Sequence, residues 1–149
     1  MKKFNFPLHT VLNYKEQVLD SLKSEHAQMI KKVELQEKKI QDLIEKRKQT
    51  VLCFGEDMKH GVGINMMREY ESYITFMQQK ILAEQGILQK LKAREEKKRE
   101  EVVEARKEKA SIDKLKEKKL LQYNKESMRN DELFIDEFVS NTMSVHNNR

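Results

Sequence analysis

Large side chains and chain-breaking residues are scarce in this sequence. Only 7% of its 149 residues are aromatic, tryptophan is absent, and Pro7 is the one proline. Although this length allows one domain, so few large apolar side chains cannot fill a core several layers thick. They can fill a narrow seam between helices, which needs only about two apolar positions in every seven.

Disorder is the competing interpretation, because 37% of the residues are charged. Highly charged chains with little to bury stay unfolded, but they are usually rich in proline, glycine and serine. This chain has one proline and four glycines. The composition therefore favours long helices over a disordered chain.

Cysteine and long hydrophobic runs are also nearly absent. Cys53 is the one cysteine, so no intrachain disulfide is possible and a reducing compartment is expected. The opening MKKFNFPLHT has no apolar core of a signal peptide. The longest apolar run, residues 51–54, is far too short to span a bilayer. We therefore expect a soluble, cytoplasmic protein with no direct membrane insertion.

No catalytic or metal-binding constellation is evident. None of the histidines lies with the cysteine or a carboxylate at metal-ligand spacing; they are His9, His26, His60 and His146. His26 occupies a helix-seam position, where a tolerated polar residue is expected. Residues 61–63, Gly-Val-Gly, lack the preceding strand and the third glycine of a dinucleotide-binding loop. The sequence predicts a protein that is not an enzyme and uses no cofactor or metal.

The net charge is +5 and the pI is about 9.2, but the charges alternate in sign. Such mixing is typical of solvated helix faces, although a basic surface that meets an acidic partner stays open as an alternative. Residues 92–101, KAREEKKREE, place acids among the bases, and those acids would repel phosphates. We expect no binding to nucleic acid.

Apolar residues recur at alternating spacings of four and three along the chain. Nine of the fourteen positions on this ladder between residues 8 and 54 are apolar. A second ladder begins near Met67, weakens across residues 92–101 and returns towards Phe138. Gly55, Gly61 and Gly63 lie between the two ladders and favour a turn over one continuous helix.

The predicted fold is therefore all-α, a two-helix antiparallel coiled-coil hairpin with a longer C-terminal helix. We expect a single coiled-coil domain over residues 1–149. Its predicted parts are a helix over about 8–53, a turn over about 54–64, a helix over about 65–139 and a disordered tail over 140–149.

The second helix is predicted to extend beyond its partner. If the chain folds back near residue 59, Leu8 lies opposite about residue 110, and residues 111–138 have no neighbour. That stretch carries ten large apolar residues, from Ile112 to Phe138, and exposed apolar stripes mark interaction sites. Three explanations stay open: a dedicated partner, self-association of the overhangs, or a short third helix that folds back at Asn130-Asp131.

Three stretches, in order, resemble the flagellar export protein family FliJ. The opening FNFPLHTVLNYKEQ is similar to the family's F-x-F-x-L-x-x-V-L-x-x-K/R-E start. The middle, EDMKHGVGINMMREYESYITFMQQKI, resembles its glycine-containing turn and the aromatic-rich start of the second helix. The end, NKESMRNDELFIDEF, resembles its polar tail with an Asp-Glu pair. The resemblance covers about residues 4–138.

The resemblance implies a non-enzymatic stalk of the flagellar type III export apparatus. Such a stalk inserts into the hexameric export ATPase, promotes ring assembly and hydrolysis, and contacts the cytoplasmic domain of the membrane export gate. It also implies a part in chaperone cycling and a cytoplasmic location at the inner face of the cell membrane. The alternative is a generic, prefoldin-like coiled coil that self-associates as a scaffold.

Candidate partner-binding residues follow from the same resemblance. The predicted export ATPase contacts lie near the two ends of the chain; they are Leu12, Lys15, Leu19, Met128, Asp131 and Glu132. The predicted export gate contacts are Tyr73 and Met77, although a place in the helix seam is an alternative for both. Some relatives have a small residue and a histidine one and two turns further on, where this chain has Lys80 and Glu84.

Overall fold

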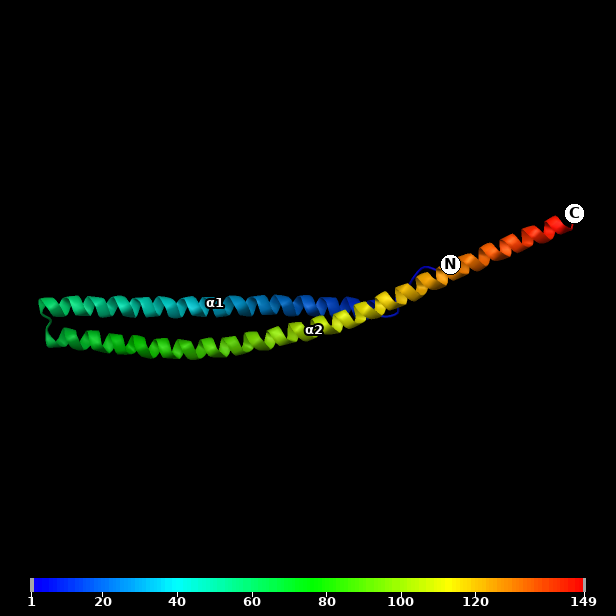
Figure 1. Ribbon diagram of the computed structural model, residues 1–149. Coiled ribbons are helices and arrows are strands. Elements are labelled where there is room, and N and C mark those ends of the chain that lie inside the picture. Colours follow the sequence, from blue (N-terminus) through cyan, green and yellow to red (C-terminus); the bar gives the residue numbers. More distant parts are fainter. Residues whose placement is uncertain (1, 149) are drawn as a thin grey trace. The chain divides into compact units, whose positions relative to one another are not determined.

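The computed structural model describes residues 2–148 and contains two helices. Helix α1 spans His9–His60 and helix α2 spans Ile64–Asn147, joined by residues 61–63 (Figure 1). Within the described residues there is no β-strand. The predicted all-α helical hairpin with a longer second helix is confirmed.

Contacts divide the chain into two compact units, which we describe separately. The turn unit comprises residues 20–103, and the terminal unit comprises residues 2–19 together with 104–148. The prediction of a single domain is not tested by this division and stays a prediction.

In the turn unit, the two helices run antiparallel and side by side (Figure 1). Salt bridges across the helices show the antiparallel direction, because the partner's number on α2 falls as the number on α1 rises. The Glu25 carboxylate lies 2.7 Å from Lys98 Nζ, and Lys39 Nζ lies 3.0 Å from the Glu84 carboxylate. The apolar seam on the turn side of the Lys39–Glu84 pair includes Ile40, Met77 and Ile81, each no more than 6% exposed. Residues three and four apart share one helix face, so the ladder read from the sequence lines this seam.

The turn is shorter than predicted. Helix α1 continues past Gly55 and ends at His60, so the predicted turn over about 54–64 narrows to residues 61–63. Gly61 has φ +86°, a left-handed conformation that is strained for residues with a Cβ atom. Helix α1 ends here because Gly61 turns the chain, whereas Gly55 costs a helix of this length only about 1 kcal/mol and does not end it.

In the terminal unit, residues 2–8 form a non-helical N-terminal strap that lies along α2. Phe6 is 5% exposed, the rings of Phe4 and Tyr123 lie 5.4 Å apart, and the Tyr123 hydroxyl donates to the Lys2 carbonyl at 2.6 Å. The predicted overhang over residues 111–138 therefore begins too early in the sequence. The strap, which precedes His9 at the start of α1, covers α2 as far as about Tyr123.

Residues 128–148, the terminal segment, are exposed at every position. Helix α2 runs without a break through Asn130 and Asp131 to Asn147. The structure therefore has no third helix folding back at Asn130-Asp131, and the predicted tail over 140–149 is helical through Asn147. No proline or glycine follows Gly86, so nothing in the local sequence ends the helix earlier.

Candidate partner-binding surfaces

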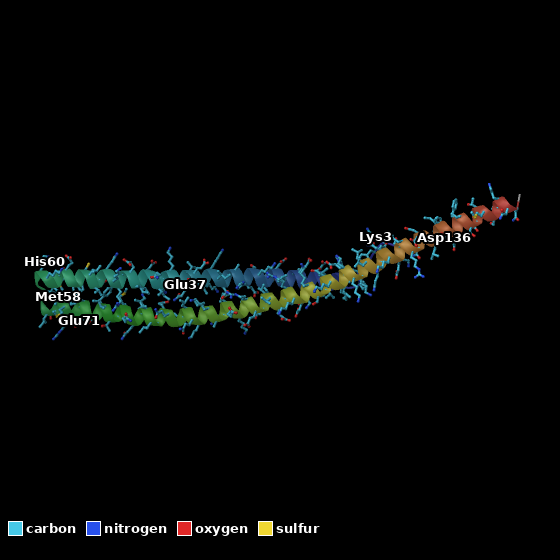
Figure 2. All side chains as sticks on the ribbon, viewed as in Figure 1. Lys3, Glu37, Met58, His60, Glu71 and Asp136 are labelled. Carbon is cyan, nitrogen blue, oxygen red and sulfur yellow. The ribbon has the colours of Figure 1, made fainter. Side chains whose placement is uncertain are left out.

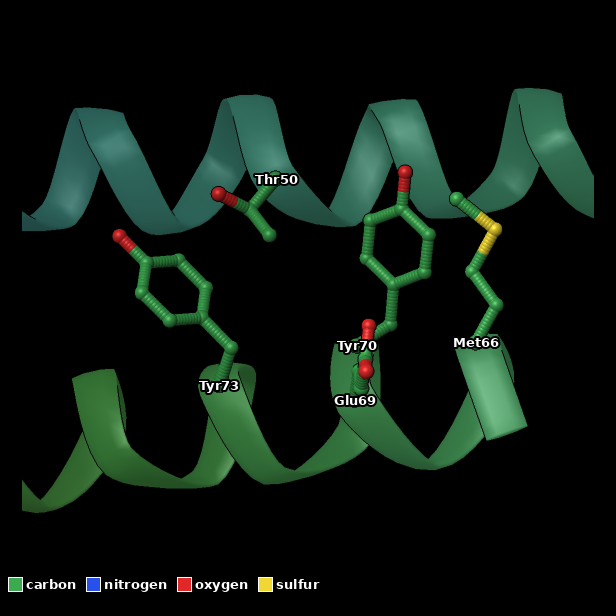
Figure 3. Close-up of a pocket in the computed structure, with 5 residues that line it drawn as sticks. All are labelled: Thr50, Met66, Glu69, Tyr70 and Tyr73. Carbon is green, nitrogen blue, oxygen red and sulfur yellow. The ribbon is translucent and has the colours of Figure 1, made fainter.

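A shallow apolar depression lies beside the turn, on the face of the turn unit shown in Figure 3. It has a volume of about 320 Å³ and is lined by Thr50, Met66, Glu69, Tyr70 and Tyr73. Figure 3 shows Met66, Tyr70 and Tyr73 reaching from α2 towards α1, with Thr50 facing them from α1. We call this group, together with the neighbouring Phe76, the turn-proximal surface.

The side chain of Tyr70 is held in place by two contacts to α1. Its hydroxyl donates a hydrogen bond to the carboxylate of Asp57, and its ring lies 5.0 Å from the ring of Phe54 at 43°. The hydrogen bond to Asp57 raises the pKa of the Tyr70 phenol, and partial burial raises it further. These contacts hold one wall of the depression in place, and a wall that is already ordered loses little conformational entropy when another molecule packs against it.

Of the two predicted gate-binding residues, Tyr73 and Met77 have different environments. Tyr73 is 38% exposed on the turn-proximal surface, whereas Met77 is 3% exposed and lies in the seam. Phe76, which was not among the residues predicted to bind the gate, is 56% exposed. The sequence did indicate this exposure, because Phe76 lies off the ladder of apolar residues spaced four and three apart. An aromatic residue outside the seam faces solvent unless something covers it.

Glu84 belongs to the seam rather than to an extension of this surface. It is 9% exposed, and the Gln36 side-chain amide donates to its backbone carbonyl at 3.0 Å. Hydrogen bonds from Gln36 and then Lys39 to its carboxylate lower the pKa of Glu84. His26 lies in the seam in the same way, 2.7 Å from Glu95, whose pKa is lowered mainly by that contact.

The predicted ATPase-binding residues on α1 lie in the helix pair. Leu12 and Leu19 are 4% and 5% exposed, and Lys15 bonds to the Glu108 carboxylate at 2.8 Å. That hydrogen bond raises the pKa of Lys15. These three residues hold α1 against α2, and their side chains are largely occupied by this packing.

The predicted ATPase-binding residues on α2 are free of such packing. Met128 is 65% exposed, and Asp131 and Glu132 are exposed on the terminal segment. Met128 lies 20 residues beyond Glu108, which corresponds to about 30 Å along a helix. The structure therefore does not bring the α1 and α2 candidates together into one patch.

The terminal segment has a broad apolar face. At 100° per residue its large apolar side chains fall on one half of the helix, with the exception of Leu133; they are Met128, Phe134, Ile135, Phe138, Val139, Met143 and Val145. Figure 2 shows the side chain of Asp136 on this stretch with no second chain segment beside it. We call these seven side chains the terminal face.

A basic groove lies where the strap meets α2. It has a volume of about 440 Å³, and its charged lining residues are Lys2, Lys3, Lys119 and Glu126. Lys3 is labelled in Figure 2, beside the part of α2 that the strap covers. This groove could not be predicted from the sequence, because the strap has no helical periodicity to reveal it.

Two further observations concern residues 2–148. No group of three or more His, Cys, Asp or Glu side chains in this part of the chain could hold a metal ion. None of the described helices has a stretch that is long and apolar enough to cross a membrane.

Comparison with known families identifies the family to which the chain belongs. The model of the family described as "Flagellar FliJ protein" matches residues 4–148, which is nearly the whole chain. Neither the curated proteins nor the solved structures contain a significant match.

Proposed function

Since the chain belongs to the FliJ family and is thus a structural component of the flagellar protein export apparatus, we propose that it acts there as the stalk of the export ATPase. In this role the terminal segment inserts into the hexameric ATPase ring and promotes ring assembly and hydrolysis. One observation carries the proposal: the terminal face presents seven large apolar side chains to solvent. Exposed apolar patches of this kind mark sites where another molecule binds.

The α2 candidates have the chemistry for this contact. Met128 supplies flexible apolar surface, and Asp131 and Glu132 place two negative charges beside it. The α1 candidates would act differently, because Leu12 and Leu19 are buried. We propose that they, with Lys15, hold the base of the terminal unit together while the terminal segment makes the contact.

The turn-proximal surface is our proposed binding site for the cytoplasmic domain of the export gate. Tyr73 and Phe76 offer exposed aromatic surface, and aromatic residues carry much of the binding energy at protein interfaces. Met77 would act indirectly, since its burial assigns it to the seam beneath that surface. Through these two contacts the protein would link the ATPase to the gate at the inner face of the cell membrane. A part in export chaperone cycling belongs to the same proposal.

The test is ATP hydrolysis and ring assembly by the cognate export ATPase in the presence of this protein. A version truncated after Ser127 removes the terminal segment and leaves the strap contacts with Tyr123 in place. The full chain should stimulate hydrolysis and ring assembly, and the truncated chain should stimulate neither. Equal stimulation by both would show that the terminal segment is not the part that enters the ring.

A matched pair of substitutions sharpens this test. Phe138 lies on the terminal face, whereas Leu133 lies on the other side of the same helix, and both are more than half exposed. Phe138→Ser should reduce stimulation, and Leu133→Ser should leave it close to that of the unmodified protein. If the two variants lose stimulation equally, the terminal face is not the contact surface.

The gate contact has its own control. Phe76→Ala should weaken binding to the gate domain by about tenfold, the scale of one well-packed aromatic contact, without lowering helix content. Leu82→Ala, a change at another exposed site further along α2, should leave binding unchanged. Unaltered binding in the Phe76 variant would remove Phe76 from the proposed site.

A further inference from the structure

Part of α2 carries a second seam, on the side away from the strap. Leu121, Met128 and Ile135 follow one another at steps of seven residues and are 62%, 65% and 58% exposed. Steps of seven return to nearly the same helix face. Tyr123, which the strap covers, is two residues from Leu121 and so lies about 200° around the helix. The strap therefore leaves this seam open.

The charge along the same stretch changes sign at its centre. Residues 114–125 hold five lysines and one glutamate, a net charge of +4. Residues 126–137 hold five acids and one arginine, a net charge of −4. Two copies of the stretch side by side in parallel would place like charges together, whereas an antiparallel pair would place the basic half of each copy against the acidic half of the other. Charge complementarity thus favours a second copy in antiparallel orientation as the occupant.

We propose that α2 pairs with α2 of a second copy in antiparallel orientation, centred on Met128. In this register Leu121 of each copy packs near Ile135 of the other, so the open seam between these positions is covered along about 21 Å, the rise of 14 helical residues. Lys125 of each copy faces Glu132 of the other, and the two-fold symmetry forms this pair twice. No ion pair of Lys125 or Glu132 forms within the described residues, so both side chains are available.

The pairing does not depend on the export ATPase. The dimer can therefore be disproved while the proposed function stands, and the proposed function can be disproved while the dimer stands. The two proposals share the terminal face, however. A dimer of this kind would cover the part of that face at Met128 and Ile135 before the ATPase binds, and the ATPase would have to displace the second copy there.

Charge reversal tests the orientation. In sedimentation equilibrium of the full chain, Lys125→Glu alone should weaken dimerisation about tenfold, because two attractive pairs become repulsive. Glu132→Lys alone should do the same. An equimolar mixture of the two single variants should dimerise as tightly as the unmodified protein, because the glutamate introduced into one chain then faces the lysine introduced into the other.

Weakening in both single variants, followed by recovery in the mixture, separates antiparallel pairing from a parallel, in-register pair, in which Lys125 faces Lys125 and neither single variant would weaken the dimer. If the mixture stays as weak as the single variants, the proposed register is wrong. A protein that remains monomeric from micromolar to submillimolar concentration would overturn the proposal altogether. All substituted positions are exposed, and circular dichroism should show unchanged helix content in every variant.

Cysteine cross-linking gives an independent check. In a Cys53→Ser background, Met128→Cys places two thiols at the centre of the antiparallel pair, and mild oxidation should link the copies. Ile135→Cys should link poorly, because the symmetry moves its two thiols about 20 Å apart along the axis. Efficient linking at both positions would indicate a parallel pair and overturn the proposal.

Discussion

A pair of neighbouring residues offers a stringent test of the seam in the turn unit. Ile81 and Leu82 have side chains of the same atomic composition, but Ile81 is 5% exposed and Leu82 is 58% exposed. Substitution by alanine removes three carbon atoms in each case. The two changes therefore differ only in whether those atoms contact the opposite helix.

The expected costs follow from burial. Loss of three buried carbon groups at about 0.8 kcal/mol each gives about 2.4 kcal/mol, and incomplete collapse of the cavity adds to this. The better helix propensity of alanine returns about 0.4 kcal/mol. We expect Ile81→Ala to lower the free energy of unfolding by about 2–3 kcal/mol, and Leu82→Ala to change it by less than about 0.5 kcal/mol.

The assay is urea unfolding followed by far-ultraviolet circular dichroism and by tyrosine fluorescence. Coincident transitions by the two probes would justify a two-state treatment. Equal losses for the two variants, or a loss below about 1 kcal/mol for Ile81→Ala, would refute the register that places Ile81 in the seam.

Three further predictions concern other parts of the turn unit. Gly61→Ala should lower the free energy of unfolding by about 1–2 kcal/mol in the same urea assay, because Gly61 has φ +86°; Gly63→Ala, without such a φ, is the control. Glu84 has a pKa lowered below its ordinary value of 4.5, so its contribution to stability is present above that pH and is lost as the pH falls through the folded-state pKa. Glu84→Gln should therefore lower stability at neutral pH and flatten the loss of stability in acid, whereas Glu71→Gln at an exposed site should do neither. The raised pKa of Tyr70 predicts that one tyrosine loses its proton above the ordinary value of 10.0 in a spectrophotometric titration, and that Tyr70→Phe removes this late component. A titration curve unchanged by that substitution would contradict the assignment to Tyr70.

The helices were predictable because their signal is local. Leu12, Leu19 and Ile40 stand on the ladder read from the sequence, and all three are buried. Leu8 stands on the same ladder but is 36% exposed, because helix α1 begins only at His9. Periodicity thus identified the seam but not the residue at which the helix starts.

The partners across the seam were not predictable. His26 was identified from the sequence as a polar seam position, but its bond to Glu95, like that of Gln36 to Glu84, depends on the register between the helices. That register follows from the position at which the chain turns. The fold-back was predicted near residue 59, whereas the observed turn comprises residues 61–63, so pairings derived from the prediction were displaced along α2.

The strap was not predictable for a different reason. Its contacts join residues more than 100 positions apart, such as Phe4 and Tyr123, and it has no repeating pattern of its own. Its aromatic residues were noticed only as part of a family resemblance. The overhang was consequently predicted to begin too early, and the basic groove was missed.

The polar layers of the seam bear on how the candidate surfaces are kept in place. A seam of apolar residues alone tolerates a slip by one heptad, because each apolar position is replaced by another. The bonds of Gln36 and Lys39 to Glu84 do not tolerate it, since a slip would leave a nearly buried carboxylate without its partners. Buried polar residues at seam positions are known to specify register in this way. In the turn unit the same register determines that Thr50 of α1 faces Tyr70 and Tyr73 of α2. The short turn over residues 61–63 and the seam polar residues therefore act together to give the turn-proximal surface one composition.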